Sequence, residues 1–362
     1  MLTAMAPQSL QQVGGWPEVL GTLTAHRDLD RDTAHAAMAE ILEGEATPVQ
    51  IAGFIVALRM KGETVEELTG LVGAMRERAV PVDLARPEGV IDLVGTGGDR
   101  SHSINVSTLA ALTVVGAGGR VCKHGNRAAS SACGAADVLE ALGVALDVPP
   151  ARQADVLAEA GIVFLFAPLY HPSLRHAGTA RRELGIQTPF NFLGPLANPA
   201  RPAAQAVGIA NARMAQIVAG VLAARGTRGL VFHGDDGLDE LTTTTTSDVW
   251  LIADHRVQPT TLNPADLGLT PAARDDLLGG DAAHNASIVR GVLDGVKGPV
   301  RDIVLLNAAA ALLAFAGPDL DGDLTAQLAD QLQVAARAID SGAAAEALSR
   351  WVAASTRAAE SA

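Results

Sequence analysis

The chain has 362 residues, of which 48% are hydrophobic, 19% charged and 3% aromatic. This composition is typical of a soluble globular protein with room for two domains. The net charge of −13, from 27 Lys and Arg against 40 Asp and Glu, argues against a nucleic-acid-binding or anionic-membrane surface, because such surfaces need concentrated cations. The two cysteines, Cys122 and Cys133, have neither CxxC nor zinc-site spacing, so we expect no disulfide framework.

The first fifth of the chain is predicted to be helical. Thr47 with Gln50, and Thr64 with Glu67, have the spacing of capping boxes, and apolar residues follow each at helical intervals. The Pro- and Gly-containing segment 81–89 then interrupts the pattern. We therefore expect a helical domain over residues 1–85 and an α/β domain over residues 86–362.

From Val90 onward, strand-like and helix-like segments alternate. Such alternation predicts a mainly parallel sheet flanked by helices, with ligands at the carboxyl ends of the strands. The expected strands are 90–94, 121–123, 162–166, 206–210, 230–232 and 249–252, and the expected helices include 107–115, 136–142, 153–160, 214–224, 305–315 and 327–351. The segment after 252 is predicted to be a loop, and the threonine run 242–246 to be extended.

Two segments of this α/β region resemble anion-binding loops. GTGGD at 95–99 and KHGNR at 123–127 each follow a predicted strand, and the second continues into two serines. Glycine leaves backbone N–H groups unshielded, so an anionic oxygen can approach closely. One such loop is also typical of a plain strand-to-helix turn, but two at this spacing favour a substrate with phosphate at both ends.

These loops, together with NVST at 105–108 and ADVLEALG at 136–143, closely resemble the anthranilate phosphoribosyltransferase family. The resemblance covers nearly the whole chain. It implies transfer of a phosphoribosyl group from phosphoribosyl diphosphate to the amine of anthranilate in tryptophan biosynthesis, with Mg²⁺ as cofactor. It also implies a homodimer formed through the helical domain, to which residues of about 168–195 contribute.

The resemblance assigns roles to individual residues, and no side chain stands out as a general base. Lys123, Asn126 and the metal would stabilise the transition state, while an arylamine is already neutral at pH 7. The anthranilate-binding residues are Gly95, Asn126, His171 and Arg181, and the metal ligands are Ser107, Asp239 and Glu240. The donor-binding residues are Gly95, Gly98, Asp99, Ser103, Asn105, Val106, Ser107, Thr108, Lys123, His124, Gly125, Asn126, Arg127, Ala128, Ala129, Ser130 and Ser131.

Without the resemblance, several of these residues have simpler interpretations. Arg181 and its neighbour Arg182 would be a solvated helix face. Asp239 and Glu240 would be an acidic turn, although that interpretation suits Asp235 and Asp236 better. A zinc site at His171 and His176 is not expected, because a spacing of five does not bring two ligands to one helix face.

The sequence departs from the family pattern at three positions. Arg100 stands where glycine is usual, Ala135 where a donor-contacting serine is common, and Leu174 where tyrosine or methionine is frequent. Alternatives are a paralogue that uses a substituted anthranilate, a pyrimidine nucleoside phosphorylase and a non-catalytic nucleic-acid-binding relative. The KHGNR segment and the Asp239–Glu240 pair argue against the second, and the acidic balance argues against the third.

The N-terminal segment has no basic and apolar leader pattern. We also expect no run of the roughly 18–20 apolar residues that a membrane helix needs. The sequence therefore predicts a cytoplasmic protein that associates with neither membranes nor nucleic acid.

Overall fold

A computed structural model describes residues 9–84, 89–128 and 132–361 of the chain. The predicted donor-binding residues Ala129, Ser130 and Ser131 lie outside the described residues. The chain divides into two compact units. The smaller, helical unit comprises Met1–Val80 and Pro168–Pro199, and the larger unit comprises Pro81–Ala167 and Ala200–Ala362.

The helices of the smaller unit begin where the sequence places capping residues. Both predicted capping boxes are confirmed, because the Thr47 and Thr64 side chains each accept the amide three residues on, at 3.3 Å. The elements of this part of the chain are η1 (Leu10–Val13), α1 (Gly15–Thr24), α2 (Arg31–Glu43), α3 (Pro48–Lys61), α4 (Val65–Glu77), α8 (Ala167–Tyr170), η4 (Pro172–Leu174), α9 (Arg175–Leu184), α10 (Phe190–Leu193) and η5 (Gly194–Leu196).

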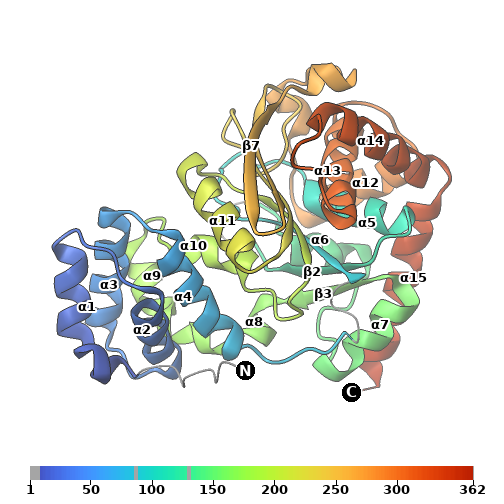
Figure 1. Ribbon diagram of the computed structural model, residues 1–362. Helices are drawn as coiled ribbons and strands as arrows, with labels where there is room; N and C mark the ends of the chain where they lie inside the picture. The colour runs from blue at the N-terminus through green and yellow to red at the C-terminus, as the bar shows by residue number, and fades with distance from the viewer. Residues whose placement is uncertain (1–8, 85–88, 129–131, 362) are drawn as a thin grey trace. The chain divides into compact units, whose positions relative to one another are not determined.

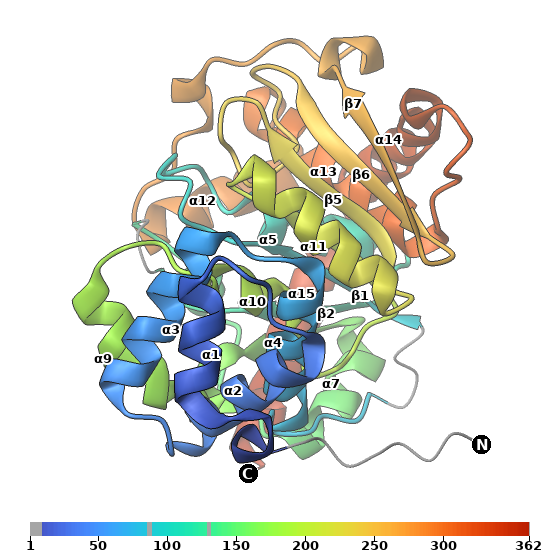
Figure 2. The same cartoon turned by 60° about the vertical axis from the view of Figure 1, so that its left-hand side comes forward.

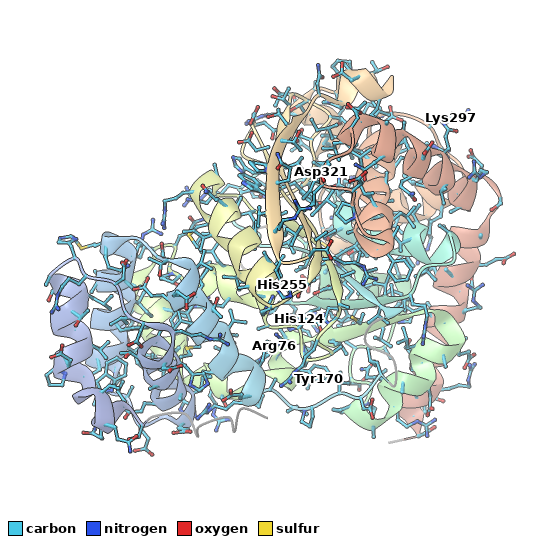
Figure 3. All side chains as sticks on the ribbon, in the orientation of Figure 1. Arg76, His124, Tyr170, His255, Lys297 and Asp321 are labelled. Carbon is cyan, nitrogen blue, oxygen red and sulfur yellow. The ribbon has the colours of Figure 1, made fainter. Side chains whose placement is uncertain are left out.

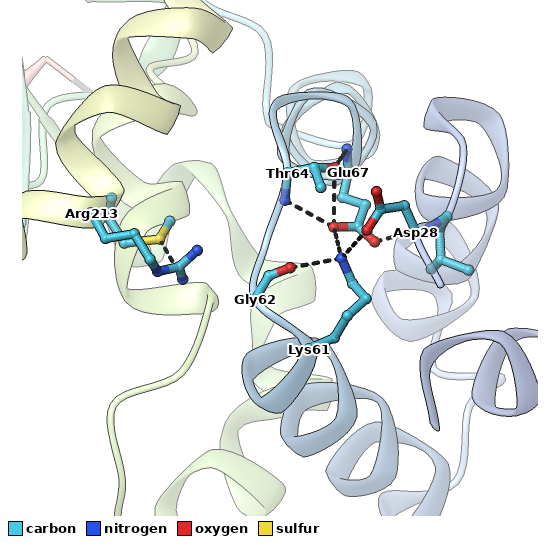
Figure 4. A network of polar contacts seen from close by, with 8 residues as sticks. Asp28, Lys61, Gly62, Thr64, Glu67 and Arg213 are labelled. Carbon is cyan, nitrogen blue, oxygen red and sulfur yellow. Dashed lines mark hydrogen bonds and ion pairs between the residues drawn. The ribbon is translucent and has the colours of Figure 1, made fainter. Parts of the chain in front are cut away.

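A buried ion pair joins the helices of this unit (Figure 4). Lys61, at the end of α3, donates to Glu67 Oε2 at 2.9 Å and to Asp28 Oδ1 at 2.7 Å. Glu67, fully buried on α4, also accepts the Leu29 amide at 3.0 Å. Because the carboxylate is paired on several sides, its burial is compensated, and the segment before α2 is fastened to α3 and α4.

The larger unit is built on a seven-stranded sheet of order β3-β2-β1-β4-β5-β6-β7. The first five strands in this order run parallel, and β6 and β7 are added antiparallel, so the predicted mainly parallel sheet is confirmed. The strands are β1 (Ile91–Gly95), β2 (Val121–Gly125), β3 (Ile162–Phe166), β4 (Ala204–Gly208), β5 (Arg228–Gly234), β6 (Ser247–Ala253) and β7 (Arg256–Leu262).

Helices cover both faces of this sheet. Figures 1 and 2 show α11 on one face of β5 and β6, with α13 and α14 on the other. The helical segments are α5 (Val106–Gly116), α6 (Ala135–Leu142), η3 (Pro150–Arg152), α7 (Gln153–Ala160), α11 (Ala212–Ala224), η6 (Pro264–Leu267), η7 (Arg274–Leu277), α12 (Ala282–Leu293), α13 (Pro299–Ala316), α14 (Leu324–Asp340) and α15 (Ala343–Glu360).

Three predictions for the C-terminal half were wrong. Strand β7 replaces an expected loop: it is the last strand of the sheet, it is largely exposed, and it contains Pro259, which an edge strand tolerates. The single helix expected over 327–351 is two helices, because Gly342 adopts φ 81° between α14 and α15. Within the threonine run 242–246, residues 243–245 form bends instead of extended backbone.

Among the described residues, one helix is long and apolar enough to pass a length-and-composition test for a membrane span, although Arg301, Asp302 and Asn307 interrupt its apolar run. Helix α13 has 18 residues and a mean hydropathy of 1.6, so it passes such a test by length and composition alone. Within the larger unit, however, 72% of this stretch is buried, against β4, β5 and α5 among others. A central helix packed on several sides is apolar all round, which accounts for its composition.

The strand order creates a switch point between β1 and β4. In the sheet, β2 and β3 lie on one side of β1, whereas β4 and β5 lie on its other side. The chain therefore continues in opposite directions across the sheet after β1 and after β4. At such a point the loops that follow the two strands diverge, which leaves a crevice at their carboxyl ends. The GTGGD loop follows β1 and therefore begins at this crevice.

Candidate active site

The loop after β1 curls tightly at the switch point. Gly97 and Gly98 adopt φ 65° and 79°, which side chains other than glycine rarely allow. Thr96 joins the loop to β4, because its amide donates to Gly208 O at 3.0 Å and its hydroxyl accepts the Ala210 amide at 3.1 Å. The loop is thus held against the end of the neighbouring strand.

The loop between β5 and β6 brings Asp239 to the same place. Asp239 Oδ2 accepts the Gly97 amide at 2.6 Å. The backbone of Asp239 lies against Gly208, where a Cβ atom would stand 1.7 Å from the Asp239 carbonyl oxygen. At Gly95 a Cβ atom would stand 2.2 Å from Asp239 Oδ2. Glycine is therefore required at the ends of both β1 and β4 for the carboxylate to reach the crevice.

Lys123 points into this crevice from β2. Its side chain is almost fully buried, and Nζ donates to Leu93 O at 2.7 Å and to Ser107 Oγ at 3.0 Å. Burial lowers the pKa of Lys123, while the charges of Asp92, Glu240 and Asp239 act in the opposite direction. The ammonium group thus faces the carboxylates across the switch point.

The surroundings of Asp239 and Glu240 disfavour the charged forms of both carboxyl groups. Burial, followed by the charge of Asp99, raises the pKa of Asp239 to about 7. Burial and the charge of Asp239 raise the pKa of Glu240 well above its usual range, although Lys123 and the Ser107 amide oppose this. A cation between these carboxylates would remove the repulsion and stabilise both charged forms.

The oxygen donors present at the switch point suit Mg²⁺. Mg²⁺ is usually bound by one or two carboxylates and keeps its other positions for water and substrate phosphate. Asp239, Glu240 and the neighbouring Ser107 hydroxyl provide such a set. Within residues 9–84, 89–128 and 132–361, no group of three or more His, Cys, Asp or Glu side chains could form a complete protein cage. An open, two-carboxylate site is consistent with that finding.

The first turn of α5 adds an amide and a hydroxyl. Asn105 precedes the helix, and its side chain is tied to Cys133 O at 3.2 Å and to Asn285 Nδ2 at 2.9 Å. Val106 begins the helix, and Thr108 is buried with its hydroxyl unpaired in the described part of the chain. A buried unpaired hydroxyl is costly, so its presence in this turn is consistent with a polar ligand.

Apart from Lys123, the KHGNR segment directs its charged and ring side chains into the protein or toward α6. The His124 ring is buried within the larger unit (Figure 3), and its amide donates to Asp92 Oδ1 at 3.0 Å. Arg127 turns away to Asp137 and Glu140 on α6 and lies 5.5 Å from the ring centre of Phe166. The Arg127 guanidinium is therefore already paired in this structure.

Asp137 is a residue whose role the sequence did not reveal. Its Oδ2 accepts the Gly134 amide at 2.8 Å and the Ala128 amide at 3.1 Å, while Oδ1 pairs with Arg127. These bonds lower the pKa of Asp137 against the effect of burial. The signal was present in the motif at 136–143, where an acidic residue occupies the first turn of a helix.

A cavity of about 220 Å³ lies beside the GTGGD loop. Asp99 and Ser103 line it, together with Arg100, whose φ is 59°. The segment continues into a bridge between Ser103 and Leu278. The arginine that departs from the family pattern thus borders this cavity in a backbone conformation that favours glycine.

The remaining two predicted site residues belong to the helical unit. His171 is buried and hydrogen-bonded to the Ala197 backbone, and burial lowers its pKa to about 4. Arg181, on α9, is half-buried, with its guanidinium 5.6 Å from the ring centre of Phe190. Burial lowers the pKa of Arg181, whereas its neighbour Arg182 is exposed.

The fold and the switch-point site define a class of α/β protein that binds its ligands at the carboxyl ends of parallel strands. Two family models match the chain: "Glycosyl transferase family, helical bundle domain" over residues 17–79 and "Glycosyl transferase family, a/b domain" over residues 87–345. The class of protein is therefore that of the glycosyl transferases.

Known proteins narrow the class further. The anthranilate phosphoribosyltransferase of Arthrobacter sp. (strain FB24) is 57% identical over 96% of this chain and 99% of its own, and that of Acidothermus cellulolyticus is 57% identical over 94% and 95%. The crystal structure of the Thermus thermophilus enzyme has a TM-score of 0.86 at 39% identity, covering 93% of this chain and 99% of its own. The Saccharomyces cerevisiae enzyme in complex with PRPP and Mg has a TM-score of 0.84 at 25% identity, covering 94% and 98%.

The chain therefore belongs to the anthranilate phosphoribosyltransferase family, as its motifs predicted. The members of this family are pentosyltransferases of tryptophan biosynthesis.

Proposed function

We propose that this chain transfers the phosphoribosyl group of phosphoribosyl diphosphate to the amine of anthranilate and releases diphosphate. The observation that carries this proposal is the meeting of two carboxylates, a buried lysine and a glycine-rich loop at one switch point. The donor has a phosphate at one end and a diphosphate at the other. The two glycine-containing loops after β1 and β2 are the segments that would receive these two ends of the donor.

The donor is held by the residues that the motifs assigned to it. The Gly95–Asp99 loop binds through its backbone, since its side chains are small or turned aside. Ser107 and Thr108 bind through hydroxyls, and for Thr108 the donor would provide the missing partner. In the Lys123–Ala128 segment, Arg127 is paired with α6, and the His124, Arg127 and Ala128 amides are bonded within the protein. Lys123 is therefore the group of this segment that faces the donor.

Catalysis consists of stabilising the departing diphosphate and holding the amine in line with the ribose carbon. Asp239, Glu240 and Ser107 would hold Mg²⁺, which would supply positive charge beside the diphosphate. Lys123 adds a second fixed positive charge, kept in place by Leu93 O and the Ser107 hydroxyl. Asn126 holds the donor and the acceptor close to the ribose carbon that exchanges diphosphate for the amine. No strong base is needed to make the aromatic amine nucleophilic, because it is uncharged at neutral pH, and the proton that the nitrogen loses after the new bond forms passes to water or to the departing diphosphate.

Anthranilate is recognised through its carboxylate by Arg181. A half-buried guanidinium binds a carboxylate more strongly than an exposed one, because less water competes. His171 is neutral at pH 7 and contributes a buried, uncharged surface for the acceptor. The motifs assign Gly95 and Asn126 to the acceptor as well.

The protein is a cytoplasmic homodimer assembled through the helical unit. On α3, Val49 and Met60 are 81% and 74% exposed, and they lie about three turns apart on one side of the helix. A second copy would cover this apolar face. Sedimentation velocity would check the assembly, since a Val49→Glu variant should then be monomeric, and cell fractionation would check the location.

The activity is tested by the loss of anthranilate fluorescence with phosphoribosyl diphosphate and Mg²⁺. Arg181→Ala should raise KM for anthranilate about 10- to 100-fold, the equivalent of one charged hydrogen-bonded contact. Arg182→Ala, which removes the neighbouring exposed arginine, is the matched control and should leave KM unchanged. Equal effects of both variants would contradict the role of Arg181.

The metal site is tested in the same assay. Asp239→Asn should shift the Mg²⁺ dependence to higher concentration, whereas Asp235→Asn, on the exposed part of the same loop, should not. An absence of fluorescence change with the wild type, while calorimetry still detects donor binding, would mean that the acceptor is another compound.

A further inference from the structure

The Asp239–Glu240 pair lies in a loop of irregular backbone between β5 and β6, yet a metal site needs its ligands held within a fraction of an ångström. Residues outside the pair must therefore fix the positions of the two carboxylates. In metal sites this task usually falls to groups that hydrogen-bond to the ligands or to the backbone that carries them.

Asn307 is such a group. It is a buried polar residue in the middle of the apolar helix α13. Its Oδ1 accepts the Leu241 amide at 2.9 Å, and its Nδ2 donates to Leu241 O at 2.8 Å. Nδ2 also donates to Ile303 O, one turn earlier in the same helix, at 2.9 Å. The side-chain amide thus binds both backbone groups of the residue that directly follows Glu240.

The two hydrogen bonds between Asn307 and Leu241 fix the position of a whole backbone segment and not only of one atom. A paired donor and acceptor on a single residue set both the distance and the rotation of that peptide, as in a strand pair. Leu241 is fully buried, so water cannot replace these bonds. Because α13 packs against β1 and β4, Asn307 links the loop to the two strands that border the crevice.

A second anchor lies on the other side of the pair. Asp236 Oδ2 accepts the Thr242 hydroxyl at 2.8 Å and the Thr244 hydroxyl at 2.5 Å, and Oδ1 accepts the Leu238 amide at 3.2 Å. This closes the loop around Asp239 and Glu240 but ties it only to itself. The Gly97 amide holds the Asp239 carboxylate from the β1 loop, and Asn307 holds the backbone that directly follows the pair from α13.

We propose that Asn307 is a positioning residue for the metal site, which presents Asp239 and Glu240 to Mg²⁺ by holding the backbone of Leu241. The proposal rests on the proposed function only in taking these two carboxylates as the metal ligands. It assigns no contact with substrate to Asn307 itself.

The main test compares Asn307→Leu and Asn307→Ser with Thr113→Val. Thr113 is an equally buried polar residue on α5, which packs against α13, and its hydroxyl bonds only within its own helix. Binding of Mn²⁺ in the presence of diphosphate is measured by calorimetry, and thermal unfolding is measured alongside. Both Asn307 variants should bind the metal about 10- to 100-fold more weakly, the effect expected for loss of a residue that orients a metal ligand.

The control decides between positioning and general stability. Thr113→Val should leave metal affinity within about twofold of the wild type whatever its effect on Tm. The proposal is overturned if the folded Asn307 variants bind Mn²⁺ as tightly as the wild type, or if Thr113→Val weakens metal binding equally. Failure of the wild type itself to bind Mn²⁺ with diphosphate would instead refute the metal site in the proposed function.

A measurement on the wild type keeps the test valid if the variants do not fold. Hydrogen exchange at the Leu241 amide, without metal or substrate, should be as slow as in the core of α13, because the positioning bond is already formed. Exchange as fast as in an exposed loop, slowed only after Mg²⁺ and diphosphate are added, would show that the ligands and not Asn307 order this segment.

Discussion

Gly208→Ala is the substitution that most directly tests how the switch point is assembled. Gly208 is the last residue of β4, and a Cβ atom there would lie 1.7 Å from the Asp239 carbonyl oxygen and 2.4 Å from its carbonyl carbon. Both are backbone atoms, so no rotamer change relieves the overlap. The Asp239 peptide would have to move by more than about 1 Å, because carbon and oxygen atoms in contact prefer separations of roughly 3.5 Å.

The cost follows from what that movement breaks. Overpacking a well-packed site costs about 1–3 kcal/mol. The displaced segment also carries the Gly97–Asp239 bond of 2.6 Å and the Leu241–Asn307 bond of 2.9 Å, each worth about 1 kcal/mol if lost. We therefore expect Gly208→Ala to lower the free energy of unfolding by about 3 kcal/mol and to raise the Mg²⁺ concentration required for half-maximal activity.

Urea unfolding and a Mg²⁺ titration of activity measure the two effects. Gly291→Ala is the matched control, because Gly291 lies within α12 and a Cβ atom there would meet only Val296 Cγ2, at 3.8 Å. Alanine in a helix interior should stabilise that variant by about 1 kcal/mol. If Gly208→Ala is as stable as the wild type and needs no more Mg²⁺, the close approach of Asp239 to β4 is not a feature of the protein in solution.

Two further predictions concern a buried histidine and a strained arginine. The pKa of His171 is about 4 when folded and about 6.5 when unfolded, so the unfolded chain binds more protons between these values and stability is lost as pH falls from 6.5 to 4, by about 3 kcal/mol in total. Urea unfolding of a His171→Gln variant should lack this part of the pH dependence, and parallel curves for both proteins would disprove the assignment. Arg100 adopts φ 59°, so Arg100→Gly should raise the free energy of unfolding by about 1 kcal/mol, whereas a similar gain in Arg100→Ala would show that backbone strain is not the cause.

Local signals in the sequence were sufficient for most elements. The Thr64–Glu67 capping box predicts the start of α4, and the GTGGD motif predicts a glycine-dependent loop after a buried strand. These features depend on residues within a few positions of one another, so the pattern is visible without the fold. Strand β7 was missed because its exposed side chains and Pro259 have none of the apolar alternation of a buried strand.

The roles of polar residues inside the fold were harder to predict. A lone asparagine in the apolar run of α13 is an unusual residue, yet only the structure places its amide against Leu241. Arg127 was expected to face the donor, but in the structure it pairs with Asp137 and Glu140 on the following helix. Which of several charges a side chain meets depends on distances that spacing along the chain does not contain.

The sequence by itself determined the family, the two kinds of unit and the loops that surround the crevice, because each is encoded in a contiguous motif or a periodic pattern. Only the tertiary structure decided that Asp239 meets Gly97, which is 142 residues away in the chain. That meeting requires β1 to lie beside β4, and it requires glycine at the ends of both strands so that a third segment can approach their backbones. Strand order is set by the packing of the whole sheet and its helices, so no local stretch of sequence contains it.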